Sequence, residues 1–283
     1  MSEIFLTWFE PVLLTSLYCL LALLSGSVLM SLVLKTWAWH KLAQNTICLF
    51  TLLLPCYLWH ITVSLTDSDW SNFSTSAKLV ITQSHLGQMW LLLCFANLIA
   101  MIALFYPKIS DKNQKIACLV AFWLACLARA ASGHAADAGL LSGDVWIHSL
   151  HIAAACSWLG MIICYLWAMI KNQQHAQLST ATRHLSEVAT LCLMAMVLTG
   201  FADSLRIYQM ANNFWQSAYA SLLFIKLYLV LIVLALAGIN RWVMMPRLLS
   251  YHRAFYSIAA VECLILIIIL CLAALLGASM PDA

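Results

Sequence analysis

Charged residues are scarce in this sequence. Of its 283 residues only 9% are Asp, Glu, Lys or Arg, whereas 64% are hydrophobic, and the mean hydropathy is +0.92. A soluble domain of this length has no interior large enough to hide so much apolar surface. The composition therefore excludes a soluble protein and predicts an integral membrane protein.

Several motifs of nucleotide binding and catalysis are also missing. The sequence has no GxxxxGK[ST] phosphate loop, no GxSxG nucleophile turn and no HExxH zinc motif. Its 11 cysteines are scattered without a CxxC pair, a pattern typical of small apolar residues inside helices and not of a disulfide framework. We therefore expect neither an ATP-driven pump nor an enzyme.

Eight apolar stretches are each close to the roughly 20 residues that a helix needs to cross a bilayer. They cover residues 11–34, 43–65, 84–106, 116–134, 146–170, 185–207, 218–239 and 254–276. Backbone polar groups in hydrocarbon must be satisfied within the segment, so these stretches should be helices. The sequence predicts an all-α, polytopic bundle of eight transmembrane helices, with residues 1–283 forming a single integral-membrane domain.

Basic residues are concentrated in alternate loops. The opposite set of loops has only Lys78 and Arg206, whereas Lys and Arg recur in the loops at 35–42, 107–115, 171–184 and 240–253. Because short basic loops stay in the cytoplasm, both termini should be periplasmic in a bacterial inner membrane. These loops also explain the net charge of +3, so no nucleic-acid partner is expected, only membrane lipid. The first segment lacks a basic n-region and a cleavage site, which predicts that 11–34 is a retained span.

Five histidines fall at the predicted periplasmic ends of the spans: His60, His85, His134, His148 and His151. His134 stands where the fourth span ends. His148 and His151 follow in the first turns of the fifth span, with a spacing that puts both on one helix face, about 5–6 Å apart at Cβ. Asp144 is a plausible N-cap for that span. These three imidazoles should approach one mouth of the bundle.

Imidazole is a ligand that suits copper and zinc, and the methionine thioether selects Cu(I). Met89 shares a helix face with His85, and further methionines lie deeper at Met161, Met194 and Met196. The pattern predicts a periplasm-facing copper site whose ligands come from His134, His148, His151, His85, His60 and Met89. The alternative is structural, because histidine at a helix end near the headgroups is also comfortable without a metal.

A second polar set lies within the predicted spans. Lys226 and Glu262 enter the bilayer from opposite sides, and a buried ion pair between them would neutralise both charges. The alternative is a polar station on a permeation or proton path. Arg129, close to the end of the fourth span, is expected to extend its side chain to the surface.

Two sequence blocks resemble the copper resistance protein D family (CopD/PcoD). Residues 132–136 read SGHAA and 150–160 read LHIAAACSWLG, similar to the family's GHA motif and its LHxxAAxxWxGG helix, with Met161 where a second glycine is usual. Further matches are LTG at 198–200, the lysine at 226, NRW at 240–242 followed by PR at 246–247, and the glutamate at 262. The TxxGxxW helix of the family is similar to 84–90, with His85 as a departure.

The resemblance implies an inner-membrane protein of copper handling that moves copper from periplasm to cytoplasm. It also implies a small periplasmic copper-binding partner of the CopC type, and functional positions at His134, His151, Lys226 and Glu262. A different hypothesis is a b-type cytochrome, in which two histidines on facing helices, chosen from His60, His85 and His151, ligate haem b. An optical spectrum separates the two hypotheses.

Overall fold

The computed structural model describes residues 3–34, 38–66, 71–137, 139–140, 142–171, 175–210 and 218–278. The side chains at 3–7, 134, 175–181, 207, 209–210, 218, 248–250, 252 and 278 lie outside this description. Over the described ranges the chain is helical and has no strand. Its main helices are α1 (Glu3–Val33), α2 (Trp39–Thr66), α3 (Phe73–Gln83), α4 (His85–Phe105), α5 (Asp111–Ala131), α6 (Gly143–Ile170), α7 (His175–Met210), α8 (Ala218–Ile239) and α9 (Leu248–Ala278).

All of these helices except α3 are long and apolar enough to cross a membrane, which confirms the predicted all-α fold with eight spans. The predicted boundaries coincide with those of α8 and are furthest off in α7, which begins ten residues before the predicted start at 185. Helix α5 also begins early, five residues before the predicted start at 116. There Ser110 accepts a hydrogen bond from Asn113 N at 3.4 Å and an ion pair of 2.8 Å joins Lys115 to Asp111. A polar first turn can thus be helical although it lacks a hydropathy signal.

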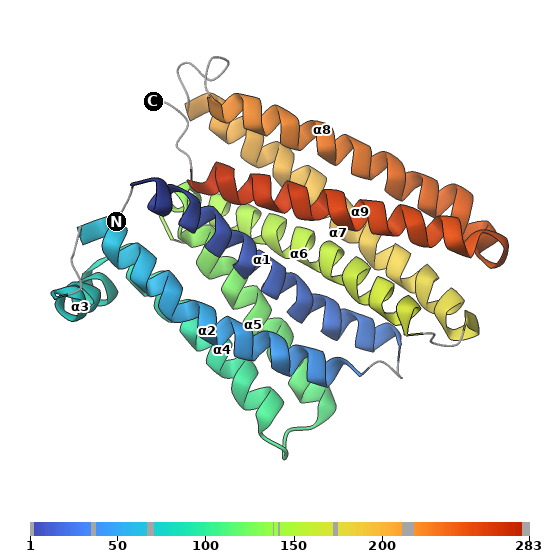
Figure 1. Ribbon diagram of the computed structural model, residues 1–283, viewed down its shortest axis with the longest axis horizontal. Coiled ribbons are helices and arrows are strands. Elements are labelled where there is room, and N and C mark those ends of the chain that lie inside the picture. Colours follow the sequence, from blue (N-terminus) through green and yellow to red (C-terminus); the bar gives the residue numbers. More distant parts are fainter. Residues whose placement is uncertain are drawn as a thin grey trace.

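Helix α3 occupies part of the segment 66–83 that the sequence predicts as a loop. It packs on α2 and α4 and buries Ala77 and Val80. Its close approach to α4 depends on Gly87, because a Cβ at that position would lie 2.1 Å from Val80 O. In Figure 1 this short helix lies at the end of the bundle beside the start of α4.

Helix α1 lies in the middle of the bundle, with α2, α4 and α5 on one side and α6 to α9 on the other (Figure 1). Its closest partner is α6, and the two backbones meet at Gly26 and Gly160. A Cβ on Gly160 would lie 1.8 Å from Ala22 O, and one on Gly26 would lie 2.2 Å from the Gly160 carbonyl carbon. Small residues at helix crossings allow this approach in membranes, where packing contributes much of the association energy.

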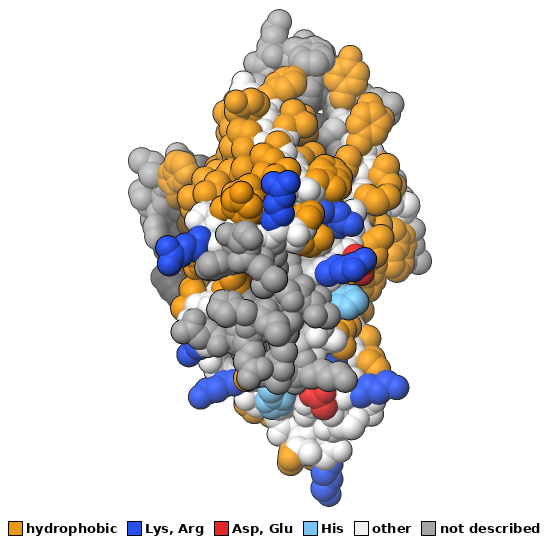
Figure 2. Space-filling model, turned by 90° about the vertical axis from the view of Figure 1, so that its right-hand side faces the viewer, with side chains coloured by type: hydrophobic (Ala, Val, Ile, Leu, Met, Phe, Trp, Pro, Cys, Tyr) orange, Lys and Arg blue, Asp and Glu red, His pale blue; other side chains and the backbone are white. Residues whose placement is uncertain are grey.

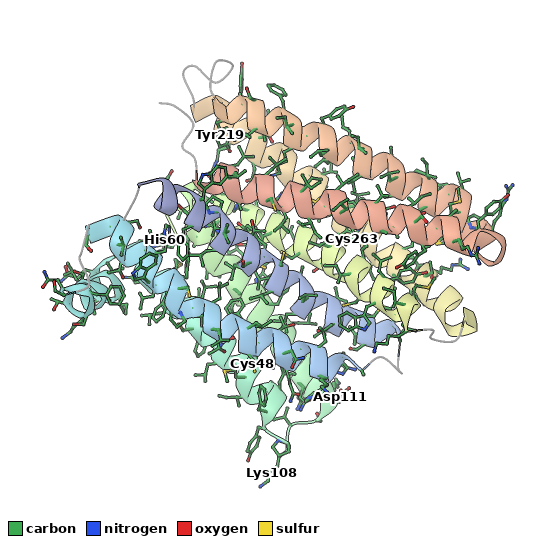
Figure 3. All side chains as sticks on the ribbon, in the orientation of Figure 1. Cys48, His60, Lys108, Asp111, Tyr219 and Cys263 are labelled. Carbon is green, nitrogen blue, oxygen red and sulfur yellow. The ribbon has the colours of Figure 1, made fainter. Side chains whose placement is uncertain are left out.

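The bundle has two chemically different ends. Helices α1, α4, α6 and α8 begin at one end, which we call the histidine end, and α2, α5, α7 and α9 finish there. Figure 3 places His60 and Tyr219 at this end, with Lys108 and Asp111 at the other. Figure 2 faces the side that holds the far ends of α8 and α9, where Lys and Arg side chains are spread over the surface and few acidic ones are visible. The five histidines predicted as ligands are therefore separated from the basic loops along the bundle axis.

Helices α7 and α8 form the outer flank of the bundle. Within the described ranges α7 packs mainly on α6, α8 packs mainly on α9, and the two have few direct contacts with each other. Both expose large apolar side chains such as Leu198, Phe201, Tyr228 and Leu231. Such a surface suits hydrocarbon and not water.

Candidate functional site

His148 and His151 lie in the first turns of α6 and both face α7. Their imidazole planes differ by only 10°, with ring centroids 6.3 Å apart, which confirms that they share one helix face. His148 Nδ1 lies 2.7 Å from Asp203 Oδ2, and His151 Nδ1 lies 3.1 Å from the hydroxyl oxygen of Thr199. Each ring thus contacts a side-chain oxygen of α7 through the same nitrogen.

The hydroxyl of Thr199 determines which nitrogen of His151 carries the proton. Thr199 Oγ1 lies 2.6 Å from the carbonyl oxygen of Ala195, and a carbonyl oxygen only accepts. The single hydroxyl proton is therefore donated to Ala195, and the hydroxyl oxygen accepts from His151 Nδ1–H. In the neutral ring this leaves a lone pair on Nε2, the form of imidazole that binds a metal.

Asp203 has the same effect on His148. An ionised carboxylate only accepts, so the 2.7 Å contact places a proton on His148 Nδ1 and a lone pair on Nε2 of the neutral ring. Metal-binding histidines typically donate their second ring nitrogen to a carboxylate or another oxygen in this way, which fixes both the tautomer and the ring orientation. In both neutral rings the lone pair is therefore on Nε2, the nitrogen that does not contact Thr199 or Asp203.

A second pair ties the two helices together near their ends. Arg206 Nη1 lies 3.3 Å from Asp144 Oδ2. The prediction that Asp144 caps α6 is wrong, because the cap is Ser142, which accepts a hydrogen bond from Val145 N at 3.4 Å. Asp144 lies in the first turn and pairs with α7 instead. We call Asp144, His148, His151, Thr199, Asp203 and Arg206 the α6–α7 cluster.

Two further residues adjust the space and the charge around His151. Gly200 lets the ring lie against α7, because a Cβ there would come 3.0 Å from His151 Cε1. Lys226 of α8 is an electrostatic neighbour of both His151 and Asp203. The α6–α7 cluster thus combines two imidazoles, two carboxylates and the guanidinium of Arg206, with the amino group of Lys226 as a neighbour from α8.

The other predicted ligands lie at the same end but are separately engaged. His60 of α2 is buried, with Nε2 3.5 Å from Glu10 Oε2, and Met89 packs against the core. His85 Nε2 lies 2.5 Å from the carbonyl oxygen of Ala131.

His134 begins the short 3₁₀ helix His134–Ala136, which packs on α5 and α6, but its side chain is outside the described residues. Among described residues no three or more His, Cys, Asp or Glu side chains gather as a metal site. Of the predicted ligands whose side chains are described, only His148 and His151 stack on one another, and the metal-binding role of the whole set stays a prediction.

Comparison with known proteins identifies the family. The N-terminal domain of copper resistance protein D-like proteins matches residues 5–144, and Copper resistance protein D matches residues 179–276. The chain belongs to the copper resistance protein D family. This confirms the resemblance seen in the sequence motifs.

Two known proteins align with about two thirds of the chain. Inner membrane protein YebZ of Escherichia coli (strain K12) is 24% identical over 198 residues, 65% of this chain and 64% of that protein. Copper resistance protein D of Pseudomonas syringae pv. tomato is 27% identical over 204 residues, 68% of this chain and 65% of that protein. The chain thus spans less than two thirds of either relative. No solved structure matches it. With its eight spans, this family member is a multi-pass inner-membrane protein.

Lys226 and Glu262, two residues of the family motifs that lie within the spans, do not form the predicted ion pair. Glu262 of α9 accepts a hydrogen bond from Asn240 Nδ2 at 2.7 Å, and no ion pair joins it to Lys226 within the described residues. The predicted ion pair is wrong because the residue that lies opposite Glu262 is Asn240, in the π-helical turn after α8. Lys226 lies 14 residues earlier, about 21 Å along the helix.

Arg129 also differs from its prediction. Its side chain does not reach the surface: only 8% of the residue is exposed, and Nε donates to the phenol oxygen of Tyr18 at 3.1 Å. Gly277 of α9 provides the space, because a Cβ there would lie 3.1 Å from Arg129 Nη2. Tyr18 gives the guanidinium a hydrogen-bond partner inside the bundle, so extension to the surface is unnecessary.

The partners on α7 are the functional candidates that sequence reasoning missed. Thr199 and Asp203 were not assigned to the histidines because nothing in a single sequence states which helix faces α6. A signal was present: Thr199, Asp203 and Arg206 recur at intervals of four and three residues, which places polar groups on one face of an otherwise apolar span.

Proposed function

We propose that this protein binds copper at His148 and His151 and passes it across the inner membrane, as an importer that contributes to copper resistance. The observation that carries the proposal is the hydrogen bonding of the two imidazole rings. Thr199 and Asp203 each occupy Nδ1, which leaves both Nε2 atoms as available donors. Imidazole nitrogen suits copper, and the oxygen partners increase its basicity.

The orientation of the bundle supports loading from the periplasm. Lys and Arg side chains lie around the end opposite the histidine end (Figure 2), and basic short loops are retained in the cytoplasm. We therefore propose that both termini and the α6–α7 cluster face the periplasm. A small periplasmic copper-binding protein of the CopC type would deliver the ion there, and the protein would act without catalysing a reaction.

Buried thioethers provide the next position along the bundle. Met161 lies ten residues beyond His151 on α6 and is 2% exposed, while Met196 of α7 is 7% exposed and packs in the same core cluster. Thioether sulfur favours Cu(I). Met194 is 56% exposed on the outside of α7, so we leave it out of the proposed relay.

Copper content of the detergent-purified protein tests the proposal. We compare the wild type with the double variant His148→Ala/His151→Ala and with His184→Ala, a matched control whose exposed ring pairs with Glu187 at the basic end. The expected result is copper bound by the wild type and by the control, with at least tenfold less in the double variant. Equal copper in all three would contradict the proposal, and a Soret band lost in the double variant would favour haem b instead.

A further inference from the structure

A buried polar contact joins α9 to the π-helical turn that follows α8, outside the α6–α7 cluster. Asn240 and Glu262 are 6% and 5% exposed, and Asn240 Nδ2 donates to Glu262 Oε1 at 2.7 Å. Glu262 is 9 residues into the span that begins at Arg253, about 13 Å along the helix and thus well inside the hydrocarbon. An ionisable side chain at this depth is costly and calls for a functional explanation.

The contact is incomplete in a specific way. Asn240 Oδ1 is buried without a hydrogen-bond partner, and no cation of the described residues forms an ion pair with Glu262. Within the described residues the amide oxygen of Asn240 therefore lacks a hydrogen-bond donor, and the carboxyl group of Glu262 lacks a positively charged partner. Leaving a buried acceptor unsatisfied costs about 1–3 kcal/mol, and more when a charge is involved.

The nearby titratable groups do not supply the missing charge. Arg241 follows Asn240 but turns to α7, where its Nη1 donates to Ser186 O at 2.7 Å and also to the hydroxyl of Thr190. Tyr165 of α6 is hydrogen-bonded to Thr182 at 3.0 Å. Other titratable groups on α9 and the elements packed against it include the thiols Cys19, Cys164, Cys263 and Cys271, the phenols Tyr251 and Tyr256, the exposed Arg247 and Arg253 near the start of α9, and Lys226, about 21 Å from Asn240 along α8.

The backbone at Asn240 is also unusual. Residues Asn240–Met244 form a π-helix, with wider hydrogen bonding than the α8 helix that precedes it. Single π-turns inside helices are rare and are frequently found at functional sites. The distorted backbone therefore coincides with the unsatisfied amide oxygen of Asn240, beside a carboxyl group that has a hydrogen bond but no ion pair within the described residues.

We propose that Glu262 is a proton-binding site, at which the carboxyl group takes up and releases a proton in the middle of the membrane. A proton on Glu262 neutralises the carboxylate and is a donor of the kind that Asn240 Oδ1 lacks. Copper fits the site poorly, because carboxylate and amide oxygens suit hard ions and not Cu(I). If copper passes along the bundle as proposed above, movement of this proton in the opposite direction would balance the charge that copper carries. That coupling rests on the proposed function.

Infrared spectroscopy of the purified, copper-free protein tests the site directly. In the wild type we expect a carbonyl band of a protonated carboxylic acid that shifts in D₂O and disappears reversibly as the pH is raised. The isosteric variant Glu262→Gln should lose this band completely. Glu187→Gln, which removes an exposed glutamate at the basic end, should retain it.

A second variant addresses the hydrogen bond. Asn240→Ala removes the donor to Glu262 Oε1, so the acid carbonyl band should move to higher frequency. The proposal is overturned if Glu262→Gln removes no acid band at any pH, if that band ignores both pH and D₂O, or if Asn240→Ala leaves its position unchanged.

Copper content measured on the same preparations keeps the two proposals apart. We expect Glu262→Gln to bind as much copper as the wild type. Loss of copper binding by His148→Ala/His151→Ala tests the outer site alone, whereas the acid band tests Glu262 alone.

Discussion

Asp203→Asn tests whether the carboxylate of α7 prepares His148 as a ligand. Asparagine has nearly the same size, but its amide group can donate to His148 Nδ1, which would move the ring proton to Nε2 and remove the lone pair that binds copper. Oxygen partners of metal-binding histidines change metal affinity by about 10–100-fold. The His148 side chain is 36% exposed, so we expect the lower part of this range, about tenfold or 1.4 kcal/mol.

The assay is copper affinity in detergent, measured by competition with a chelator of known affinity. Glu187→Gln is the matched control, because it alters a carboxylate that also contacts a histidine, His184, at 3.5 Å, but in an exposed pair at the basic end. Its affinity should equal that of the wild type. Unchanged or tighter copper binding by Asp203→Asn would refute the reasoning about the tautomer.

Two other predictions concern packing and charge. Gly160→Ala should lower the midpoint of thermal unfolding in detergent by several degrees, because the added Cβ would lie 1.8 Å from Ala22 O. The control Gly143→Ala should leave the midpoint unchanged, because nothing lies within 4 Å of its Cβ. Equal midpoints for the two variants would contradict the α1–α6 contact. Lys226→Gln should tighten copper binding by about three- to tenfold, because it removes a positive charge beside His151. Weaker binding in the same competition assay would argue against that placement of the ammonium group.

The sequence predicted the spans well because hydropathy is a local property. Length and apolar composition identify each membrane helix regardless of its neighbours. Helix α3 was missed because Ala77 and Val80 provide only a short apolar face, which the docking onto Gly87 makes sufficient. The periplasmic orientation of the termini stays a prediction from the charges of the loops.

The candidate site was predicted only in part. The i, i+3 spacing placed His148 and His151 on one face, as the structure has them. Which helix they face depends on long-range packing, so neither Thr199 nor Asp203 was assigned to them. The same limit explains the wrong pair of Lys226 and Glu262, since the vertical offset of α8 and α9 depends on a turn whose length a hydropathy reading does not fix.

X-ray absorption at the copper edge of the loaded protein tests the central claim most directly. We expect a nitrogen shell with the outer scattering of imidazole in the wild type, and the loss of that imidazole signal in His148→Ala/His151→Ala. A copper spectrum with only sulfur or oxygen neighbours, or an imidazole signal that survives in the double variant, would contradict copper binding by these two histidines.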